Sequence, residues 1–230
     1  MNYINFKGID SRSLQGLIIQ ELPPITKPEM RVQSTVIDGK DGDIQENIGY
    51  SAYDKTLKIG LSRKFDINEI IKYFNGNGDV IFSNEPDKVY EASIVKQIDY
   101  ERLLTFRTAN VKIHVQPYKY LLNELAVDVT INNETEVVVN NVGLEIAKPI
   151  INLYGSGIVE ISINDYAQFQ IDIDDESVTI DCEEQEAYKG NNLKNHLMIG
   201  EFPIFEVGEN VITWTGILEK IVVIPKSRWL

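Results

Sequence analysis

Two successive prolines divide the first part of the chain more sharply than any other feature. Pro23 and Pro24 each fix φ and lack an amide donor, so a strand that precedes them has to leave its sheet there. β-type runs follow at residues 31–37 and 43–53, with apolar side chains that are few and widely spaced. The pattern predicts a β-hairpin arm over residues 22–53 that cannot form a core of its own.

The centre of this arm carries two of the strongest turn dipeptides. Asp38-Gly39 and Asp41-Gly42 follow each other closely, and glycine accepts the left-handed backbone that tight hairpin turns require. The same acidic run also resembles part of a calcium-binding loop. Lys40 and Gly42, however, stand where such a loop needs oxygen ligands. We therefore interpret the run as a turn.

An arm of this kind needs a surface to order it, because an isolated two-stranded hairpin is only marginally stable in water. That surface is either its own domain or a neighbouring subunit. In the second case the contact is heterologous, and it closes into a ring when the rotation between subunits allows. Arg31 is suited to pairing with a neighbour's carboxylate. The residues expected at this interface are Arg31, Val32, Ile37, Asp38, Gly39, Asp41, Gly42, Tyr50 and Tyr53.

The charge of the chain excludes several classes of partner. Its 230 residues carry a formal net charge of −13, which opposes binding to nucleic acid and to an anionic membrane surface. Cys182 is the single cysteine, so no disulfide within the chain is possible. The N-terminus lacks the order of a signal peptide, and no apolar run is long enough to span a bilayer. We expect a soluble protein made in the cytoplasm.

Only one helix is expected, over residues 66–75. Asp66 can cap it, Glu69 stands at the capping-box position, and Gly76 can end it.

The longest strands of the first half follow this helix. Residues 88–100 and 103–116 are expected to form a tight hairpin at the centre of a sheet, and residues 117–120 to end the strand pattern. The first half is thus interpreted as a β-rich domain with one helix and one arm, over residues 1–122.

The second half, residues 123–230, is interpreted as an all-β domain. Short strand candidates recur with turn residues between them, as in a jelly-roll-like β-sandwich. They are residues 127–131, 137–139, 149–154, 158–163, 169–173, 178–182, 205–207, 211–214 and 221–224. The last residues are expected to pack back on the first domain.

The residues that carry chemistry are sparse. His114 alternates with apolar residues in a strand, His196 lies in an Asn-rich loop, and Cys182 ends a strand as a small buried residue. The carboxylates of residues 172–176 fit an exposed hairpin tip better than the facing pair of a glycosidase. We expect no catalytic residue, no metal site and no cofactor.

Short motifs follow one another in a recognisable order along the chain. In the first half they are Phe6-x-Gly8-x-Asp10-Ser11, Leu22-Pro23-Pro24-Ile25, Pro28, Arg31-Val32 and Ile37-Asp38-Gly39-x-Asp41-Gly42. In the second half they are Asn141-x-Gly143, Pro149-Ile150-Ile151-x-Leu153-x-Gly155-x-Gly157, Ile180-Asp181, Gly200-x-Phe202-Pro203, Gly208-x-Asn210-x-Ile212 and Pro225-x-x-Arg228-Trp229. Together they resemble the distal tail proteins of long-tailed bacteriophages that infect Gram-positive hosts.

The resemblance implies a structural hub at the tip of a phage tail. In that family, six copies form a ring through N-terminal domains that are similar to tail-tube subunits, and a hairpin belt embraces the neighbour. Residues 22–53 match this belt in position. The C-terminal domain would be a galectin-like sandwich that projects outward. The implied partners are the tail-tube protein, the tail-associated tip protein and a receptor-binding protein, all in the virion tail.

A carbohydrate-binding module is the alternative interpretation, because the second half alone would suit a lectin-like sandwich. The aromatic residues that could stack on sugars are Tyr154, Tyr166, Tyr188 and Trp214. For Trp214 we prefer the interpretation that it is a strand residue whose side chain is half-buried in the core of the domain.

Overall fold

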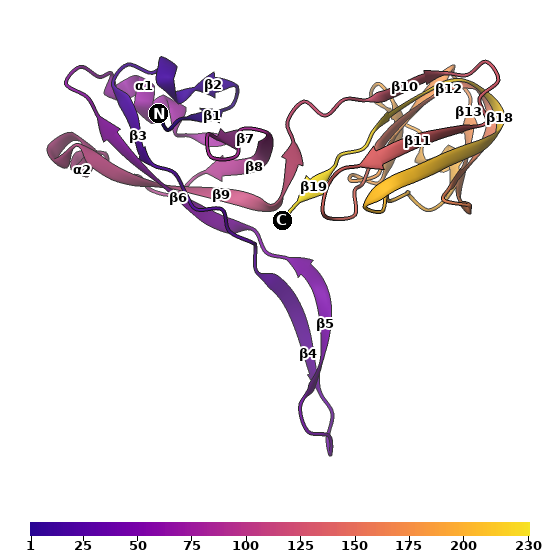
Figure 1. The fold of residues 1–230 in the computed structure, drawn as a ribbon, viewed down its shortest axis with the longest axis horizontal. Helices are drawn as coiled ribbons and strands as arrows, with labels where there is room; N and C mark the ends of the chain where they lie inside the picture. Colours follow the sequence, from indigo (N-terminus) through magenta and orange to yellow (C-terminus); the bar gives the residue numbers. More distant parts are fainter. The chain divides into compact units, whose positions relative to one another are not determined.

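The computed structural model describes residues 1–230, apart from the side chain of Ala167. The chain forms two compact units, Met1–Leu122 and Asn123–Trp229, and each is described by itself (Figure 1). Strands dominate both units, so the predicted mainly β fold is confirmed.

One antiparallel sheet organises the first unit. Its strands, in spatial order, are β2 (Ile9–Asp10), β1 (Ile4–Phe6), β7 (Gly76–Phe82), β8 (Lys88–Ile94), β9 (Thr108–Leu121), β6 (Tyr53–Leu61) and β3 (Leu17–Glu21). In β6 and β9 alternate side chains are buried, as Leu57, Ile59 and Val111 illustrate. Because strand side chains alternate between the two faces, the sheet has one apolar face and one polar face.

Helix α1 (Ile67–Tyr73) lies where the sequence predicts it. The Asp66 carboxylate accepts hydrogen bonds from the amides of Asn68 and Glu69, which are otherwise unpaired donors of the first turn. At the other end, the buried Tyr73 hydroxyl donates towards the carbonyl oxygens of Ile4 and Ile9. The helix is thereby capped at its start and fastened to the N-terminal strands at its end.

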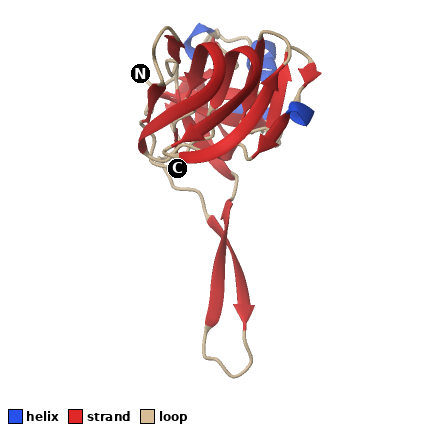
Figure 2. Cartoon of the chain, turned by 90° about the vertical axis from the view of Figure 1, so that its right-hand side faces the viewer, coloured by secondary structure: helices blue, strands red, loops and turns tan.

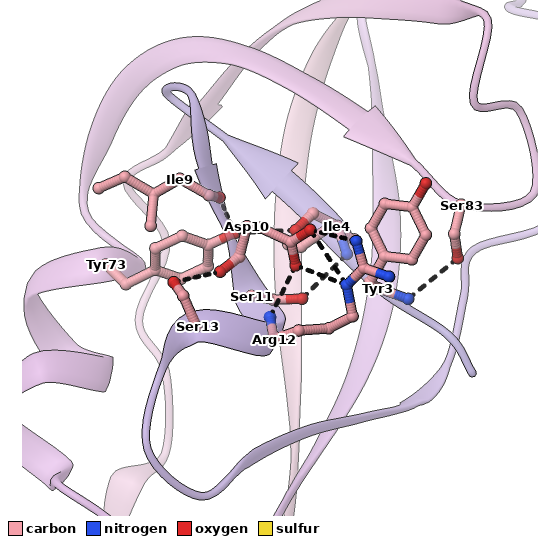
Figure 3. Close-up of polar contacts among 9 residues, drawn as sticks. All are labelled: Tyr3, Ile4, Ile9, Asp10, Ser11, Arg12, Ser13, Tyr73 and Ser83. Atoms are coloured by element: carbon pink, nitrogen blue, oxygen red, sulfur yellow. Dashed lines mark hydrogen bonds and ion pairs between the residues drawn. The ribbon is translucent and has the colours of Figure 1, made fainter.

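The N-terminal turn beside α1 is held by side chains (Figure 3). The 3₁₀ helix η1 (Ser11–Ser13) begins at Asp10, whose carboxylate accepts from the Arg12 amide and pairs with the Arg12 guanidinium. That hydrogen-bonded guanidinium also lowers the pKa of Asp10. The Ser11 hydroxyl accepts the amide of Ile4, which closes the turn onto β1.

The strands expected at residues 88–100 and 103–116 pair with each other as β8 and β9, but the tight turn expected between them is wrong: a second helix, α2 (Tyr100–Phe106), connects them. The Asp99 carboxylate accepts the Arg102 amide over 2.8 Å and caps this helix. Leu103 turns inward and is fully buried. The first unit therefore has two α-helices rather than one.

Residues 117–120 do not end the strand pattern either, because β9 continues to Leu121. Pro117 lies within a β-bulge of β9: Ala92 pairs with Val115 but Tyr90 pairs with Lys119, so extra residues of β9 face Glu91. A bulge leaves residues out of the ladder, and a proline without an amide is tolerated there.

The arm is a separate two-stranded sheet. Strands β4 (Met30–Val36) and β5 (Asp43–Tyr50) pair with each other in antiparallel fashion. Both views show this hairpin projecting from the strands that carry it (Figure 1 and Figure 2). The predicted hairpin arm is confirmed, with one correction: Tyr53 begins β6 and belongs to the body of the first unit.

The second unit is built from one curled antiparallel network around a core of its own. Its strands are β10 (Val127–Thr130), β11 (Glu136–Asn141), β12 (Ile150–Ile163), β13 (Tyr166–Ile173), β14 (Ser177–Asp181), β15 (Glu186–Lys189), β16 (Asn192–Leu193), β17 (Met198–Gly200) and β18 (Gly208–Ile224), with the 3₁₀ helix η2 (Asn195–Leu197). The short strand β19 (Arg228–Trp229) is not part of this network. The central path runs β10-β18-β12-β14-β15-β16, and β11 and β13 pair with β18 and β12.

Two pairs of expected strands are joined in the structure. Residues 149–154 and 158–163 form the single strand β12, and residues 211–214 and 221–224 belong to β18. The register between β12 and β18 shifts at Gly155, whose Cα approaches the backbone of Ile217 closely. Gly155 therefore lies at a bulge where the long strand β12 bends, and not in a turn between two strands. Among the described residues, no helix is long and apolar enough to cross a membrane.

Candidate functional site

The arm is the candidate functional site because its strands pack on almost nothing in their own chain. Every residue of β4 and all of β5 except Tyr50 are exposed. The exposed residues include Val32, Val36, Ile44 and Ile48, β-branched side chains of the kind that usually cover a core. Such a surface indicates that the arm is used against another molecule.

The two faces of the hairpin differ. Cross-strand partners lie on the same face, so Thr35 shares a face with Ile44, and Ile48 follows four residues further along β5. We call this surface the isoleucine face; it also carries the paired Gln33 and Glu46. Ile37, just beyond the end of β4, is also exposed.

The opposite surface is named the Ser34 face. Ser34 pairs with Gln45, and the Ser34 hydroxyl and the Gln45 amide both donate to the Asp43 carboxylate. The hydrogen bond from Ser34, with that from Gln45 beside it, lowers the pKa of Asp43. This face also carries Val32 and Val36, whose partners across the hairpin are polar.

The turn residues fit the geometry that the sequence predicts. The Lys40 amide donates to the Ile37 carbonyl oxygen over 3.1 Å, and Gly39 and Gly42 have φ of +82° and +84°. A residue with a Cβ would be strained in that region. In the described part of the chain, no group of three or more His, Cys, Asp or Glu side chains could hold a metal ion.

Arg31 stays within its own hairpin. It lies where the register of β4 and β5 shifts, and its guanidinium approaches the Ile48 carbonyl oxygen at 3.4 Å. The contact is long for a hydrogen bond, so the guanidinium remains able to take a stronger acceptor.

The root of the arm is fastened to the first unit by aromatic and polar contacts. Tyr50 packs edge-on against Tyr118 of β9, with ring centroids 6.0 Å apart. The Tyr53 hydroxyl donates to the Thr26 carbonyl oxygen, and the Ser51 amide donates to the carbonyl oxygen of Glu29. The strands that leave the body therefore start from fixed positions.

Beneath the root lies a buried ionic cluster that the sequence did not reveal. The Lys119 ammonium is 2.5 Å from the Glu85 carboxylate, and the Tyr90 hydroxyl donates to the same carboxylate. Lys55, only 3% exposed, reaches the carbonyl oxygen of Pro24. Burial lowers the pKa of Lys55 to about 8, although the nearby Glu85 charge opposes that shift. Lys55 is in phase with the buried Leu57 and Ile59 of its strand, and Lys119 with the buried Val115, so the alternation is the signal in the sequence that could have placed both lysines on the inner face.

The remaining candidates from the sequence do not assemble into a catalytic site. His114 lies 3.1 Å from the Asp54 carboxylate, and Lys96 pairs with the same group from a partly exposed position. The bond from Lys96 is the main cause of the lowered pKa of Asp54. Cys182 is buried, and burial raises the pKa of its thiol, so the reactive thiolate is disfavoured.

The aromatic residues considered for sugar binding occupy different environments. Trp214 packs against the core of the second unit, as expected. Tyr166 is largely exposed, and Tyr154 is partly exposed, with Lys220 over its ring. His196 lies in the 3₁₀ helix η2.

No protein-family model matches the chain, and no curated protein matches it either. Among solved structures, the chain is similar to the crystal structure of the SPP1 Dit protein, described as a paradigm of the hub adsorption apparatus in phages that infect Gram-positive hosts. The two are 13% identical, the match covers 100% of both chains, and the TM-score is 0.74. A chain of the phage P2 baseplate in its activated conformation with Ca is also similar, at 10% identity over 96% of this chain and 97% of that one, with a TM-score of 0.49. The mainly β fold that the resemblance implied is confirmed: over its full length, the chain has the fold of the SPP1 Dit protein.

Proposed function

We propose that the protein is a structural hub of a phage tail tip, a distal tail protein whose copies form a ring of six. The observation that carries this proposal is the likeness to the SPP1 Dit protein over the whole of both chains. A likeness that covered only one unit would fit many β-rich proteins. Here both units occur together, and in the same chain.

The exposed arm supports the assembly part of the proposal. β4 and β5 carry apolar side chains that nothing in the described chain covers, while the root of the arm is held firmly at Tyr50 and Tyr53. A rigidly rooted arm that packs on a neighbour makes a heterologous contact, and repetition of that contact closes a ring. The belt comprises the interface residues predicted from the sequence, with Tyr53 at its root.

The partners follow from this role. The ring joins the tail-tube protein on one side to the tail-associated tip protein on the other, and the second unit carries a receptor-binding protein. The protein acts in the virion tail after synthesis in the host cytoplasm, and it works by assembly and not by catalysis. The clusters around Asp54 and Glu85, which are stabilising pairs without a nucleophile, support a structural role.

The experiment that tests the proposal compares the intact protein with a variant in which a short Gly-Ser linker replaces residues 28–50. Light scattering and negative-stain microscopy should show rings of about six times the monomer mass for the intact chain only. Because the subunits are acidic, moderate salt should promote the rings by screening repulsion. The linker variant should remain a folded monomer. Rings formed by that variant, or an intact protein that stays monomeric at all salt and protein concentrations, would contradict the proposal.

A further inference from the structure

A lysine of the first hairpin lies along the start of β7. Lys7 and Gly8 form the two-residue turn between β1 and β2, and both have positive φ, of +54° and +77°. A turn of this kind favours Asn, Asp or Gly at its first position, so a lysine there costs backbone strain. The Lys7 amide donates to the Asp79 carbonyl oxygen over 2.9 Å, which holds the turn against β7. The strained backbone thus fixes the position from which the lysine side chain extends.

Two glycines of β7 make room for this side chain. A Cβ at Gly78 would lie 2.7 Å from the Cγ of Lys7, and a Cβ at Gly76 would lie 2.9 Å from its Nζ. The ammonium also donates a hydrogen bond of 2.5 Å to the carbonyl oxygen of Asn75. It therefore lies directly on the peptide group that joins Asn75 to Gly76.

The same two glycines belong to the two Asn-Gly dipeptides of the sequence, Asn75-Gly76 and Asn77-Gly78. In such a pair the backbone nitrogen of glycine can reach the side-chain carboxamide of asparagine, because no Cβ obstructs the approach. The nitrogen attacks the carboxamide carbon as an anion, so its N–H has to lose a proton first. Both asparagines are exposed, so water has access to the product of that attack.

Lys7 distinguishes the two dipeptides. A cation at the carbonyl oxygen of a peptide stabilises the anion that this peptide forms on losing its N–H proton, because nitrogen and oxygen share the negative charge. The Lys7 ammonium occupies this position for the peptide between Asn75 and Gly76. Asn75 also precedes β7, whereas Asn77 pairs with Ser93 inside the ladder of β7 and β8. The first dipeptide is therefore both activated and less constrained.

We propose that Asn75 is a self-modification site, at which the chain converts asparagine to aspartate and isoaspartate without an enzyme. The Gly76 nitrogen forms a bond to Cγ of Asn75, and the side-chain nitrogen leaves as ammonia with the proton of the Gly76 amide. Water then opens the resulting succinimide at one of its two carbonyl groups, which gives aspartate or isoaspartate. The reaction consumes water and releases ammonia, and it does not depend on the proposed ring.

The modification would alter the junction between α1 and β7. Either product adds a carboxylate beside the Lys7 ammonium, so an ion pair becomes available to a group that now binds a neutral carbonyl. Isoaspartate also adds a methylene to the main chain between Phe74, the C-cap of α1, and Gly76. Because ammonia is lost, the change accumulates with time, and the modified fraction records the age of the protein.

Peptide mapping by mass spectrometry tests the site, because loss of the amide adds about 1 Da and fragment ions assign it to one asparagine. Isomerisation at Asp38-Gly39 or Asp41-Gly42 leaves the mass unchanged and does not interfere. The intact protein is incubated in mildly alkaline buffer, folded in one sample and unfolded in guanidinium chloride in the other. In the folded sample Asn75 should react about tenfold faster than Asn77. In the unfolded sample the two rates should agree within a few-fold, because glycine follows both.

Replacement of the lysine supplies a second readout. Lys7→Met should slow the reaction at Asn75 by about tenfold and leave Asn77 unchanged, whereas Lys7→Arg keeps a cation and should retain most of the rate. Lys64→Met removes an exposed lysine that precedes α1, and it should leave both rates unchanged.

Two results would overturn the proposal. One is a folded protein in which Asn75 reacts no faster than Asn77, and the other is a folded Lys7→Met variant in which Asn75 reacts as fast as in the intact chain. If Lys7→Met does not fold, the ratio of the two rates in the folded and unfolded intact protein decides alone. A ratio that is the same in both samples would show that the folded structure does not activate Asn75.

Discussion

The Lys55 ammonium donates a hydrogen bond to the carbonyl oxygen of Pro24 over 3.1 Å, and so joins β6 to the two prolines at which the arm begins. The nitrogen also lies 5.0 Å from the ring centre of Tyr90 and 5.4 Å from that of Tyr53. Pro24 has no amide of its own, so its carbonyl is the backbone group through which the entry of the arm can be held. A buried cation thus fixes the first residues of an exposed element.

This buried cation predicts a pH-dependent stability. The pKa of Lys55 is about 8 in the folded protein and 10.5 when exposed, so between these values the unfolded chain binds more protons. Stability therefore rises with pH across this window, and the cost of the buried charge, on the order of 3 kcal/mol, is fully present below it. Urea unfolding of the intact protein and of Lys55→Met between pH 7 and 9.5 measures the effect.

The difference between the two proteins gives the contribution of Lys55 to the pH dependence of stability, because all other titrating groups are the same in both. The unfolding free energy of the intact protein should increase relative to that of Lys55→Met as the pH rises. Parallel pH profiles would show that folding does not lower the pKa of Lys55.

The ring contact at the root of the arm predicts a local change in dynamics. In Tyr50→Ala, the edge-on contact with Tyr118 is lost, and the hydrogen bond from the Ser51 amide to Glu29 should open more often. Hydrogen exchange at Ser51 should become about three- to tenfold faster. Tyr166→Ala, at an exposed tyrosine of the second unit, is the control and should leave that rate unchanged.

The cap of α2 predicts a change in global stability. Asp99→Ala removes the acceptor of the Arg102 amide and should lower the unfolding free energy of the first unit by about 1 kcal/mol. Glu101→Ala changes a carboxylate in the same turn that makes no cap bond, and it should cost only a few tenths of that amount. Equal losses in the two variants would contradict the assignment of Asp99 as the cap.

The close approach of β12 and β18 at their bulge requires a glycine at position 155, which has no Cβ. A Cβ there would come within 2.1 Å of the Ile217 carbonyl oxygen, so Gly155→Ala must displace backbone. We expect a loss of roughly 2–3 kcal/mol in the stability of the second unit, measured by denaturant unfolding. Ser156→Ala, at an exposed neighbour, should change stability by less than about 0.5 kcal/mol.

The separate core of the second unit predicts that residues 123–230 fold alone. Circular dichroism of this fragment should show a β-rich protein without α-helix, and its NMR spectrum should be dispersed. An unfolded or helical fragment would contradict the proposed boundary after residue 122.

The arm and the first helix were predictable from sequence because their signals are local. Pro23, Pro24 and the Asp-Gly pairs have few conformations available, and Asp66 is three residues before Glu69, which is the spacing of a capping box. Each signal is completed within a few residues, so no tertiary contact was needed to interpret it.

The misinterpreted elements depended on distant partners. Asp99 is as good a cap as Asp66, but Leu103 favours a helix there only because the core receives it. Pro117 and Gly155 are residues that often end a strand, yet here they lie at bulges through which the long strands continue. Lys55 alternates in phase with Leu57 and Ile59, so its inward direction could have been predicted, but its depth and its partner Pro24 depend on the folded structure.

In the candidate site, too, the local features could be predicted and the contacts between distant residues could not. The hairpin and its turn were predicted, whereas the root contacts of Tyr50 with Tyr118 and the cluster around Glu85 join segments far apart in sequence.

The hairpin of β4 and β5 has two outer edges, and neither pairs with a further strand in the described chain. Each edge presents backbone donors and acceptors that any extended peptide can match, which makes the free arm a template for unwanted strand addition. The carboxylates of Asp38, Asp41 and Asp43 work against this by keeping like arms apart at neutral pH. High salt screens that repulsion, so the unassembled protein at high salt is a candidate for fibrous aggregation that begins at its arm and leaves both folded units intact.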